Sequence, residues 1–237
     1  MAPQPPYDEI AREAALMLGD LPNALRFRAH SVRHPAVPAR FAEGTKNPVV
    51  LVPGVYETWH YLRPVAEALN AAGHPVHIVD ALGFNRRPIP TSARIVWRRI
   101  RELDLDRVTI VAHSKGGLIG KHVLAFDDVE GRVVRVVAIA TPFAGSRMAS
   151  YAPPGALREF RPDGALIAEL RSDAETNAFI TSIAPAHDPH IPDGSHLPGA
   201  RNVTLPVVGH FRILHDPQLP ALVVAEVERE ADDVETP

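Results

Sequence analysis

The chain has 237 residues, of which 46% are hydrophobic and 22% are charged, and such proportions are typical of a folded domain rather than a disordered polymer. Because 25 basic residues face 28 acidic ones, the net charge is only -3, which gives no overall field to attract nucleic acid or an anionic membrane. This length fits one α/β domain with a single core.

Cysteine is absent from the sequence, which excludes disulfides, thiolate catalysis and cysteine-ligated metal. The first 20 residues carry charged side chains where a secretory signal needs an apolar run, so we expect no signal peptide and a cytoplasmic location. No stretch approaches the roughly 18 consecutive apolar residues of a membrane span. The binding partners must therefore be inferred from the functional site.

Residues 1–46 are predicted to hold one short amphipathic helix and a connector rich in Pro, His and Arg, forming an arm on the domain. From residue 47 onward, short β-branched runs alternate with longer helical patterns, which indicates a parallel sheet covered by helices. The predicted strands cover residues 48–52, 76–79, 108–112, 133–140, 180–184 and 202–208. The predicted helices begin near residues 62, 91, 118 and 220. We therefore predict one α/β domain over residues 47–225 with a mainly parallel sheet.

Two segments fall outside this alternation. Residues 145–179 interrupt the order of the strands with three prolines and two helical patterns, at the place where we expect a lid. Residues 226–237 contain seven charged side chains and no apolar period beyond Val227, so we expect an acidic C-terminal tail that is frayed.

The most informative stretch is V-T-I-V-A-H-S-K-G-G-L-I, residues 108–119. A strand that turns into a helix within about two residues places the central side chain on a strained, exposed corner and requires small neighbours. Ala112 and Gly116 meet this requirement around Ser114, although Ala112 departs from the usual G-x-S-x-G by one methyl group. At this point the sequence resembles the α/β-hydrolase family, and within it the lipases and esterases.

Three further segments carry the resemblance, which covers roughly residues 47 to 225. Residues 50–55 resemble the strand and loop that provide an oxyanion donor, residues 140–146 resemble the segment after the next strand in lipases, and residues 208–211 resemble their histidine loop. The resemblance implies a serine esterase or lipase that acts on a small-molecule or lipid ester and needs no metal or organic cofactor.

The predicted nucleophile is Ser114 and the predicted base is His210, because a serine hydroxyl attacks only after a base takes its proton. The family's order is serine, then acid, then histidine, and both Asp188 and Asp193 lie between the penultimate predicted strand and the histidine. We predict Asp188 as the acid that orients the histidine, because it lies on the turn after the penultimate strand. The following P-H-I-P also resembles the family's acid-x-x-aliphatic-Pro pattern.

Negative charge grows on the carbonyl oxygen during attack, and two backbone N–H groups are expected to face it. The elbow supplies the N–H of Lys115, whose side chain we take to be incidental, and the resemblance implies the N–H of Val55. The residues expected to offer substrate-binding surface are aromatic: Tyr56, Trp59, Phe84 and Phe143. Such a surface favours an uncharged acyl chain of short to medium length.

Several of these residues also fit other roles. Ser114 is also a residue type that caps a helix, and His113 is more typical of a packed structural histidine than of a second base. A metal site formed by His187, His190 and His196 lacks helical register and ordered carboxylates, so no metal is predicted. The same triad also suits an acyltransferase or a thioesterase. A catalytically silent binding module is expected to lose the serine, the histidine or an oxyanion glycine, and none is lost here.

Overall fold

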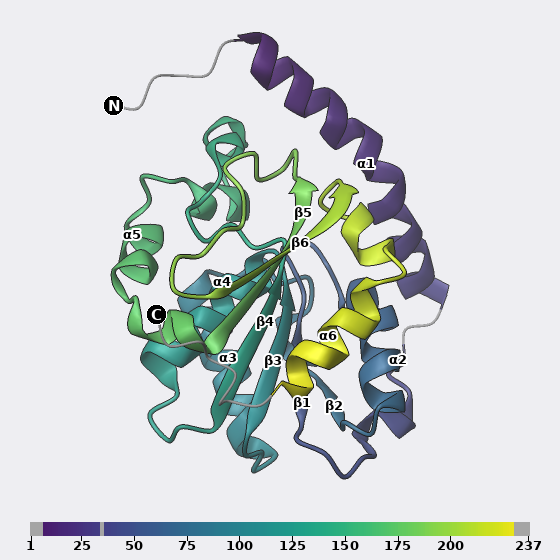
Figure 1. Cartoon of the computed structure of the whole chain (residues 1–237). Helices are drawn as coiled ribbons and strands as arrows, with labels where there is room; N and C mark the ends of the chain where they lie inside the picture. The colour runs from purple at the N-terminus through teal and green to yellow at the C-terminus, as the bar shows by residue number, and fades with distance from the viewer. Residues whose placement is uncertain (1–6, 34–35, 230–237) are drawn as a thin grey trace.

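The computed structural model describes residues 7–33 and 36–229. Its centre is a six-stranded sheet of order β2-β1-β3-β4-β5-β6, in which every neighbouring pair is parallel (Figure 1). The strands are β1 (Val49–Val52), β2 (Val76–Ile78), β3 (Val108–His113), β4 (Val133–Ile139), β5 (Ile180–His187) and β6 (Arg201–Val208). The predicted fold class, an α/β-hydrolase fold with a mainly parallel sheet, is confirmed.

Helices cover both faces of the sheet (Figure 1). One face packs against α2 (Arg63–Ala71) and α6 (Leu219–Glu228), and the other packs against α3 (Ile89–Glu102) and α4 (Lys115–His122). Strand β1 shows the consequence, since Val50 and Val52 join the core on the α3 and α4 side while Val49 and Leu51 join the opposite core. Because successive side chains point to opposite faces and both faces are covered, the strand is apolar throughout.

The predicted and observed strands agree in order and differ by at most a few residues at their ends. The largest difference is in β5, which extends three residues beyond the predicted end at residue 184 and stops at His187. Residues 185–187 stay in the sheet because they pair with β6, with Pro185 opposite Leu205 and His187 opposite Val208. Asp188 therefore follows the strand directly.

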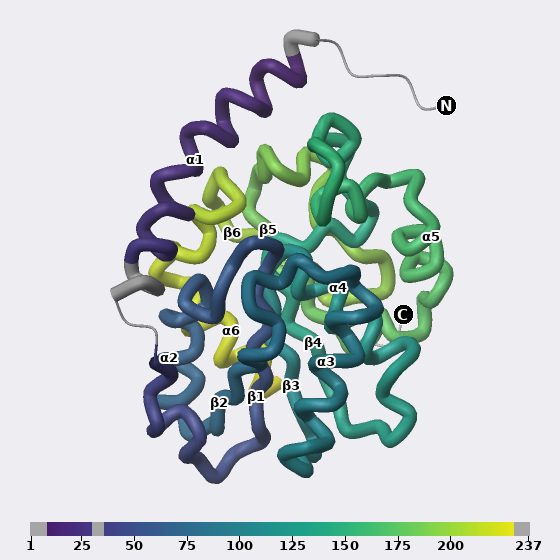
Figure 2. Tube along the Cα trace, turned by 180° about the vertical axis from the view of Figure 1, so that it is seen from behind, coloured from purple at the N-terminus to yellow at the C-terminus, as the bar shows by residue number. Residues whose placement is uncertain are grey.

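The N-terminal segment differs from the expected short helix. Helix α1 (Tyr7–Arg33) has 27 residues and continues through Pro22, although proline normally ends or kinks a helix. Figures 1 and 2 show it as one long helix along the side of the molecule, near the ends of β5 and β6. Contacts to the domain on both sides of Pro22 hold it there: Asp20 binds residues after β6, and Phe27 stacks on Tyr61.

The segment 145–179 is fastened to helix α4. It contains three 3₁₀ turns and the helix α5 (Ala165–Ser172). The ammonium group of Lys115 lies 3.1 Å from the carboxylate of Glu159, and that of Lys121 donates to the carbonyl of Asp173 at 2.7 Å. Both lysines are fully buried, so the segment covers α4 in this conformation.

The C-terminal helix continues into the predicted tail, because α6 ends at Glu228. Glu226 is buried and pairs with Arg201 at 2.9 Å, so this first residue of the predicted tail is part of the fold. Residues 230–237, which make up most of that tail, lie outside the described residues. Among the helices that the structure describes, none is both long and apolar enough to cross a bilayer.

Candidate active site

The predicted catalytic and oxyanion residues come together at one edge of the sheet. Ser114 follows β3, Asp188 follows β5, His210 lies two residues after β6, and Val55 lies in the loop after β1. Because all strands are parallel, their carboxyl ends meet at the same edge, which is where open α/β sheets bind ligands. Ser114, His210 and Val55 line a single cavity of about 660 Å³.

Ser114 occupies a strained corner. Its φ of 51° and ψ of -120° lie in a region that non-glycine residues rarely adopt, as the strand-to-helix pattern predicts. The small neighbours are needed for close packing: a Cβ on Gly116 would lie 2.1 Å from the carbonyl oxygen of Val52, and one on Gly117 would lie 2.0 Å from Oγ1 of Thr141. Helix α4 can therefore begin directly behind the serine.

The imidazole of His210 is held by a buried carboxylate. Its Nδ1 lies 2.7 Å from Oδ2 of Asp188, and both side chains are almost completely inaccessible to solvent. The other carboxylate oxygen, Oδ1, accepts hydrogen bonds from the backbone N–H groups of His190 and Ile191 at 2.8 and 3.1 Å. A carboxylate fixed at both oxygens leaves the histidine ring one orientation and directs Nε2 away from it.

Asp193, the alternative acid, lies in a different environment. Its carboxylate accepts hydrogen bonds from the backbone N–H of Arg147 at 2.7 Å and from the guanidinium group of Arg147 at 3.1 Å. The order of residues along the chain could not separate Asp188 from Asp193; in the structure Asp188 contacts His210 and Asp193 contacts Arg147.

Electrostatic effects within the site favour a basic His210. Burial alone lowers the pKa of His210, but the charge of Asp188 and its hydrogen bond outweigh burial, so the pKa lies above the ordinary 6.5. Burial raises the pKa of Asp188, and the interactions with His210 reverse this and lower it. The neighbouring His190 has its pKa lowered to about 4, chiefly by burial and then by repulsion from His210. His190 is therefore neutral near pH 7.

Among the described residues, no hydrogen bond joins the Ser114 hydroxyl to His210. Bonds of this kind are often long or poorly aligned without substrate and tighten when it binds. The two side chains nonetheless line the same cavity.

The two predicted oxyanion donors come from different elements. The N–H of Lys115 belongs to the first turn of α4, where backbone N–H groups have no partner within the helix. Val55 lines the cavity in the loop that follows β1. The side chain of Lys115 is structural rather than incidental: it is buried beside Glu159, and burial lowers the pKa of its ammonium group while Glu159 opposes the change.

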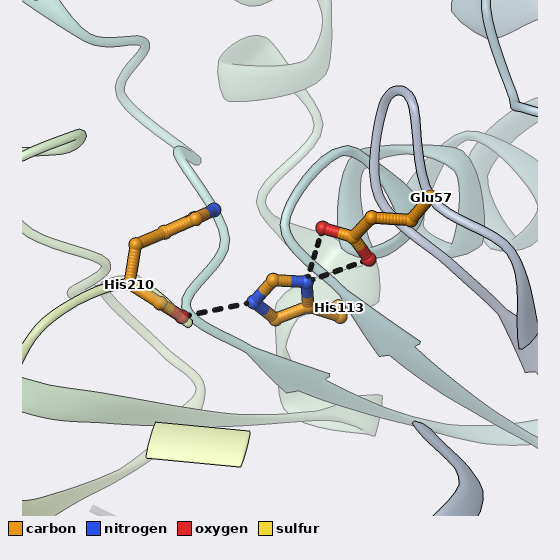
Figure 3. A group of neighbouring side chains, drawn as sticks. All are labelled: Glu57, His113 and His210. Atoms are coloured by element: carbon orange, nitrogen blue, oxygen red, sulfur yellow. Dashed lines mark hydrogen bonds and ion pairs between the residues drawn. The ribbon is translucent and has the colours of Figure 1, made fainter. Parts of the chain in front are cut away.

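A second buried carboxylate–histidine pair, Glu57 and His113, lies behind the site and was not predicted as a pair (Figure 3). Nδ1 of His113 lies 2.9 and 3.0 Å from the two carboxylate oxygens of Glu57, and Nε2 lies 3.2 Å from the backbone carbonyl of His210. Glu57 also accepts a hydrogen bond from the N–H of Gly54 at 2.8 Å. The pair thus connects the loop of Val55 to the loop of His210.

Two substitutions of Glu57 should distinguish the contribution of its charge to stability from the contribution of its hydrogen bonds. In Glu57→Gln, the amide oxygen can accept from Gly54 and the amide nitrogen can donate to Nδ1 of His113, so we expect little loss of stability. Glu57→Ala leaves both groups buried without a partner, and we expect the free energy of unfolding to fall by about 3 kcal/mol. Urea unfolding of both variants measures the difference, and equal losses would contradict this role.

Among residues 7–33 and 36–229, two groups of side chains bring metal-ligand atoms close together: Glu57, His113 and His210, and Asp188, His190 and His210. Protein hydrogen bonds already use both nitrogens of His113 and Nδ1 of His210. Because these nitrogens are already hydrogen-bonded, the two groups are better described as two carboxylate–histidine pairs than as binding sites for a metal ion.

Of the four aromatic residues predicted to contact substrate, only Tyr56 is among the described residues that line the cavity. Trp59 packs in the core, edge-on to Phe41 with ring centroids 5.9 Å apart, and Phe143 is buried between the sheet and helices α3 and α4. Phe84 is 46% exposed, and its carbonyl accepts the N–H of Tyr56. The cavity obtains its apolar surface elsewhere, from α1 and from residues 142–160.

A parallel α/β sheet with a serine on a strained strand-to-helix corner and a histidine loop at the same edge defines a class of hydrolases, and comparisons with known proteins agree. The family described as alpha/beta hydrolase fold matches residues 47–183. The chain belongs to the α/β-hydrolase family, which supports hydrolase activity.

The individual proteins that resemble this chain match it only in part or at low sequence identity. A haloalkane dehalogenase from Psychrobacter cryohalolentis is 34% identical over 102 residues, which cover 39% of this chain and only 33% of that protein. A mature lipase from Bacillus licheniformis superimposes with a TM-score of 0.59 at 17% identity, over 77% of this chain and 91% of the lipase. A monoacylglycerol lipase from Paleococcus ferrophilus gives 0.57 at 15% identity, over 78% and 96% of the two chains. At such identities the likeness to the two structures concerns the fold.

Proposed function

We propose that the protein is a carboxylic-ester hydrolase that acts through an acyl-enzyme on Ser114. The observation that carries the proposal is the nucleophile elbow facing a cavity that also contains His210, whose ring Asp188 holds at 2.7 Å. The neighbouring N–H groups of Val55 and Lys115 are suited to the negative charge of a tetrahedral intermediate, and each such donor contributes about 100-fold or more in rate.

The reaction proceeds in two halves. His210 takes the proton of the Ser114 hydroxyl as its oxygen attacks the ester carbonyl, and the resulting oxyanion faces the N–H groups of Val55 and Lys115. The intermediate then collapses to the acyl-enzyme, and His210 returns the proton to the leaving alcohol. In the second half, His210 takes a proton from the water that attacks the acyl group. It then returns the proton to the oxygen of Ser114 as the acid is released.

The cavity favours an uncharged, apolar substrate. Its lining is mainly aliphatic and aromatic, with few polar groups apart from those placed next to Ser114. We expect nitrophenyl esters of short to medium acyl length to be the best substrates. A steep rise toward the longest chains together with activation at an oil surface would count against this.

Labelling with a fluorophosphonate tests the proposal without a choice of substrate. We expect one covalent adduct per chain, mapped by peptide mass spectrometry to Ser114. A protein that remains unlabelled, or is labelled elsewhere, would contradict an activated Ser114. Product analysis with added alcohols or thiols then distinguishes hydrolysis from acyl transfer, the alternative that uses the same triad.

A further inference from the structure

Helix α1 lies outside the segment that matches the family, yet it forms one wall of the cavity that contains Ser114. Its cavity-lining residues recur at intervals of mainly three or four, which places them on one face of the helix: Ile10, Ala14, Met17, Leu21, Ala24, Leu25 and, after this apolar part, the charged Arg28. From Ile10 to Leu25 this face extends for about 22 Å at 1.5 Å per residue. The cavity wall is therefore long and apolar on this side.

A different face of α1 fastens the helix to the domain, through residues that recur every seven positions. Glu13 pairs with Nε2 of His187 at 2.9 Å, and Phe27 stacks between Tyr61 and His215. Glu13 and Phe27 are both buried. The helix is thus held in one rotation about its axis, and that rotation presents the apolar stripe to the cavity.

Asp20, the third of these buried residues, binds the loop of the catalytic histidine. Its two carboxylate oxygens accept hydrogen bonds from the backbone N–H groups of Phe211 at 2.7 Å and Arg212 at 3.1 Å, directly after His210. Only 4% of Asp20 is exposed. The position of His210 is therefore connected to the docking of α1, although the two are 190 residues apart in the sequence.

Part of the apolar stripe remains accessible to solvent. Leu21 and Leu25 are 45% and 60% exposed, and both line the mouth of the cavity beside Tyr56 and Tyr151. Apolar side chains in this position gain free energy when an apolar chain covers them. On the opposite wall, residues 146–160 are anchored through Glu159 to Lys115, so both walls of the mouth are attached to the domain.

We propose that α1 is a substrate-binding element: its stripe from Ile10 to Leu25 binds the apolar acyl chain of the ester, and Asp20 is a positioning residue for His210. This inference rests on the proposed ester hydrolysis at Ser114. If the stripe binds the acyl chain, α1 selects the acyl length, although α1 is neither part of the sheet nor a connection between its strands.

The neighbouring residues Ala14 and Ala15 provide a matched pair for the test. Both are exposed, but only Ala14 lines the cavity. In Ala14→Trp we expect kcat/KM for nitrophenyl octanoate to fall at least 10-fold through a higher KM, while nitrophenyl acetate changes less than about 2-fold. Ala15→Trp should keep the parent's preference for both esters. Identical acyl-length profiles in the two variants would overturn the role of α1.

A binding measurement separates this inference from the proposed chemistry. A methyl ketone with a ten-carbon chain resembles the ester but cannot be hydrolysed, so its affinity can be measured by calorimetry whether or not the protein is an esterase. We expect Ala14→Trp to weaken binding about 10-fold and Ala15→Trp to leave it unchanged. Equal affinities would refute the chain-binding stripe. A protein that binds the ketone through α1 but hydrolyses no ester would refute only the proposed function.

Asp20→Asn tests the positioning role. The amide keeps the shape but loses one acceptor oxygen, so we expect the loop of His210 to shift and kcat to fall about 10- to 100-fold while KM for the acetate stays close to the parent's. Glu13→Gln makes the same exchange of carboxylate for amide on α1, can still pair with His187 and does not touch that loop, so it is the control and should retain kcat.

The pH profile provides a readout that a purely structural role would not change. The charged and titratable groups around His210 are Asp188, Glu57 and Asp20, which raise its pKa, and the neighbouring His190 and His113. Removing the charge of Asp20 should shift the acidic limb of kcat/KM to lower pH. An unchanged limb and an unchanged kcat in Asp20→Asn would together contradict the positioning role.

Discussion

Ser114→Ala is expected to lower kcat for ester hydrolysis by about 10⁶-fold, the size of loss seen when the serine of another triad is removed. The reason is that no other hydroxyl occupies the strained corner at the carboxyl end of β3, where the attacking oxygen must lie next to His210. The loss of kcat can be measured from the release of nitrophenol from nitrophenyl acetate, with protein that is free of contaminating esterases. The residual rate reports what the oxyanion donors and binding contribute without the nucleophile.

The fold should survive this substitution. Alanine keeps the Cβ and removes only the hydroxyl oxygen, so the backbone at φ 51° carries the same strain as before. We therefore expect the urea midpoint and its slope to match the parent's. Activity within 10-fold of the parent in a purified, folded Ser114→Ala protein would overturn the assignment of Ser114 and the mechanism that depends on it.

The sheet and the positions of the site residues could be predicted from sequence because each depends on local patterns. The runs around residues 50, 110 and 136 are rich in β-branched residues and nearly continuous because both faces of each strand are covered. Ser114 follows from the small residues around it, since the corner tolerates little else. The family's order of residues then places the acid and the histidine after Ser114 in the chain.

The role of α1 could not be predicted in the same way. The face of α1 that docks on the domain carries Glu13 and Asp20, and carboxylates on a helix normally indicate a solvated face. They are buried because their partners, His187 and the N–H groups after His210, are supplied by segments more than 170 residues away. The same applies to Glu57, whose partner His113 is 56 residues away.

The predicted aromatic residues show that the direction of a side chain could not be predicted from the sequence. Trp59 and Phe143 lie close in sequence to the predicted oxyanion and post-strand segments, but both side chains pack in the core and not in the cavity. Proximity in sequence places a backbone near the edge of the sheet, whereas side-chain direction depends on the packing of the loop. The apolar wall that α1 contributes to the cavity therefore had to be found in the structure.

Asp188→Asn is expected to lower turnover by about 10⁴-fold, a loss with precedent in another serine triad. Oδ1 of Asp188 accepts two backbone N–H groups, and in the asparagine variant only the amide oxygen can keep those bonds, so the NH₂ group faces Nδ1 of His210. Nδ1 must then accept, which puts the proton on Nε2. In that tautomer the nitrogen that faces the cavity can no longer take the proton of Ser114.

The pH dependence and a matched variant decide whether Asp188 acts in this way. Because Asp188 is the main cause that raises the pKa of His210 against burial, the parent should lose activity as the pH falls through a value above 6.5, and the limb should move to lower pH in Asp188→Asn. Asp193→Asn, which alters only the contacts with Arg147, should keep near-normal turnover and the parent's limb. Collapse of turnover in Asp193→Asn with near-normal rates in Asp188→Asn would reverse the assignment of the acid.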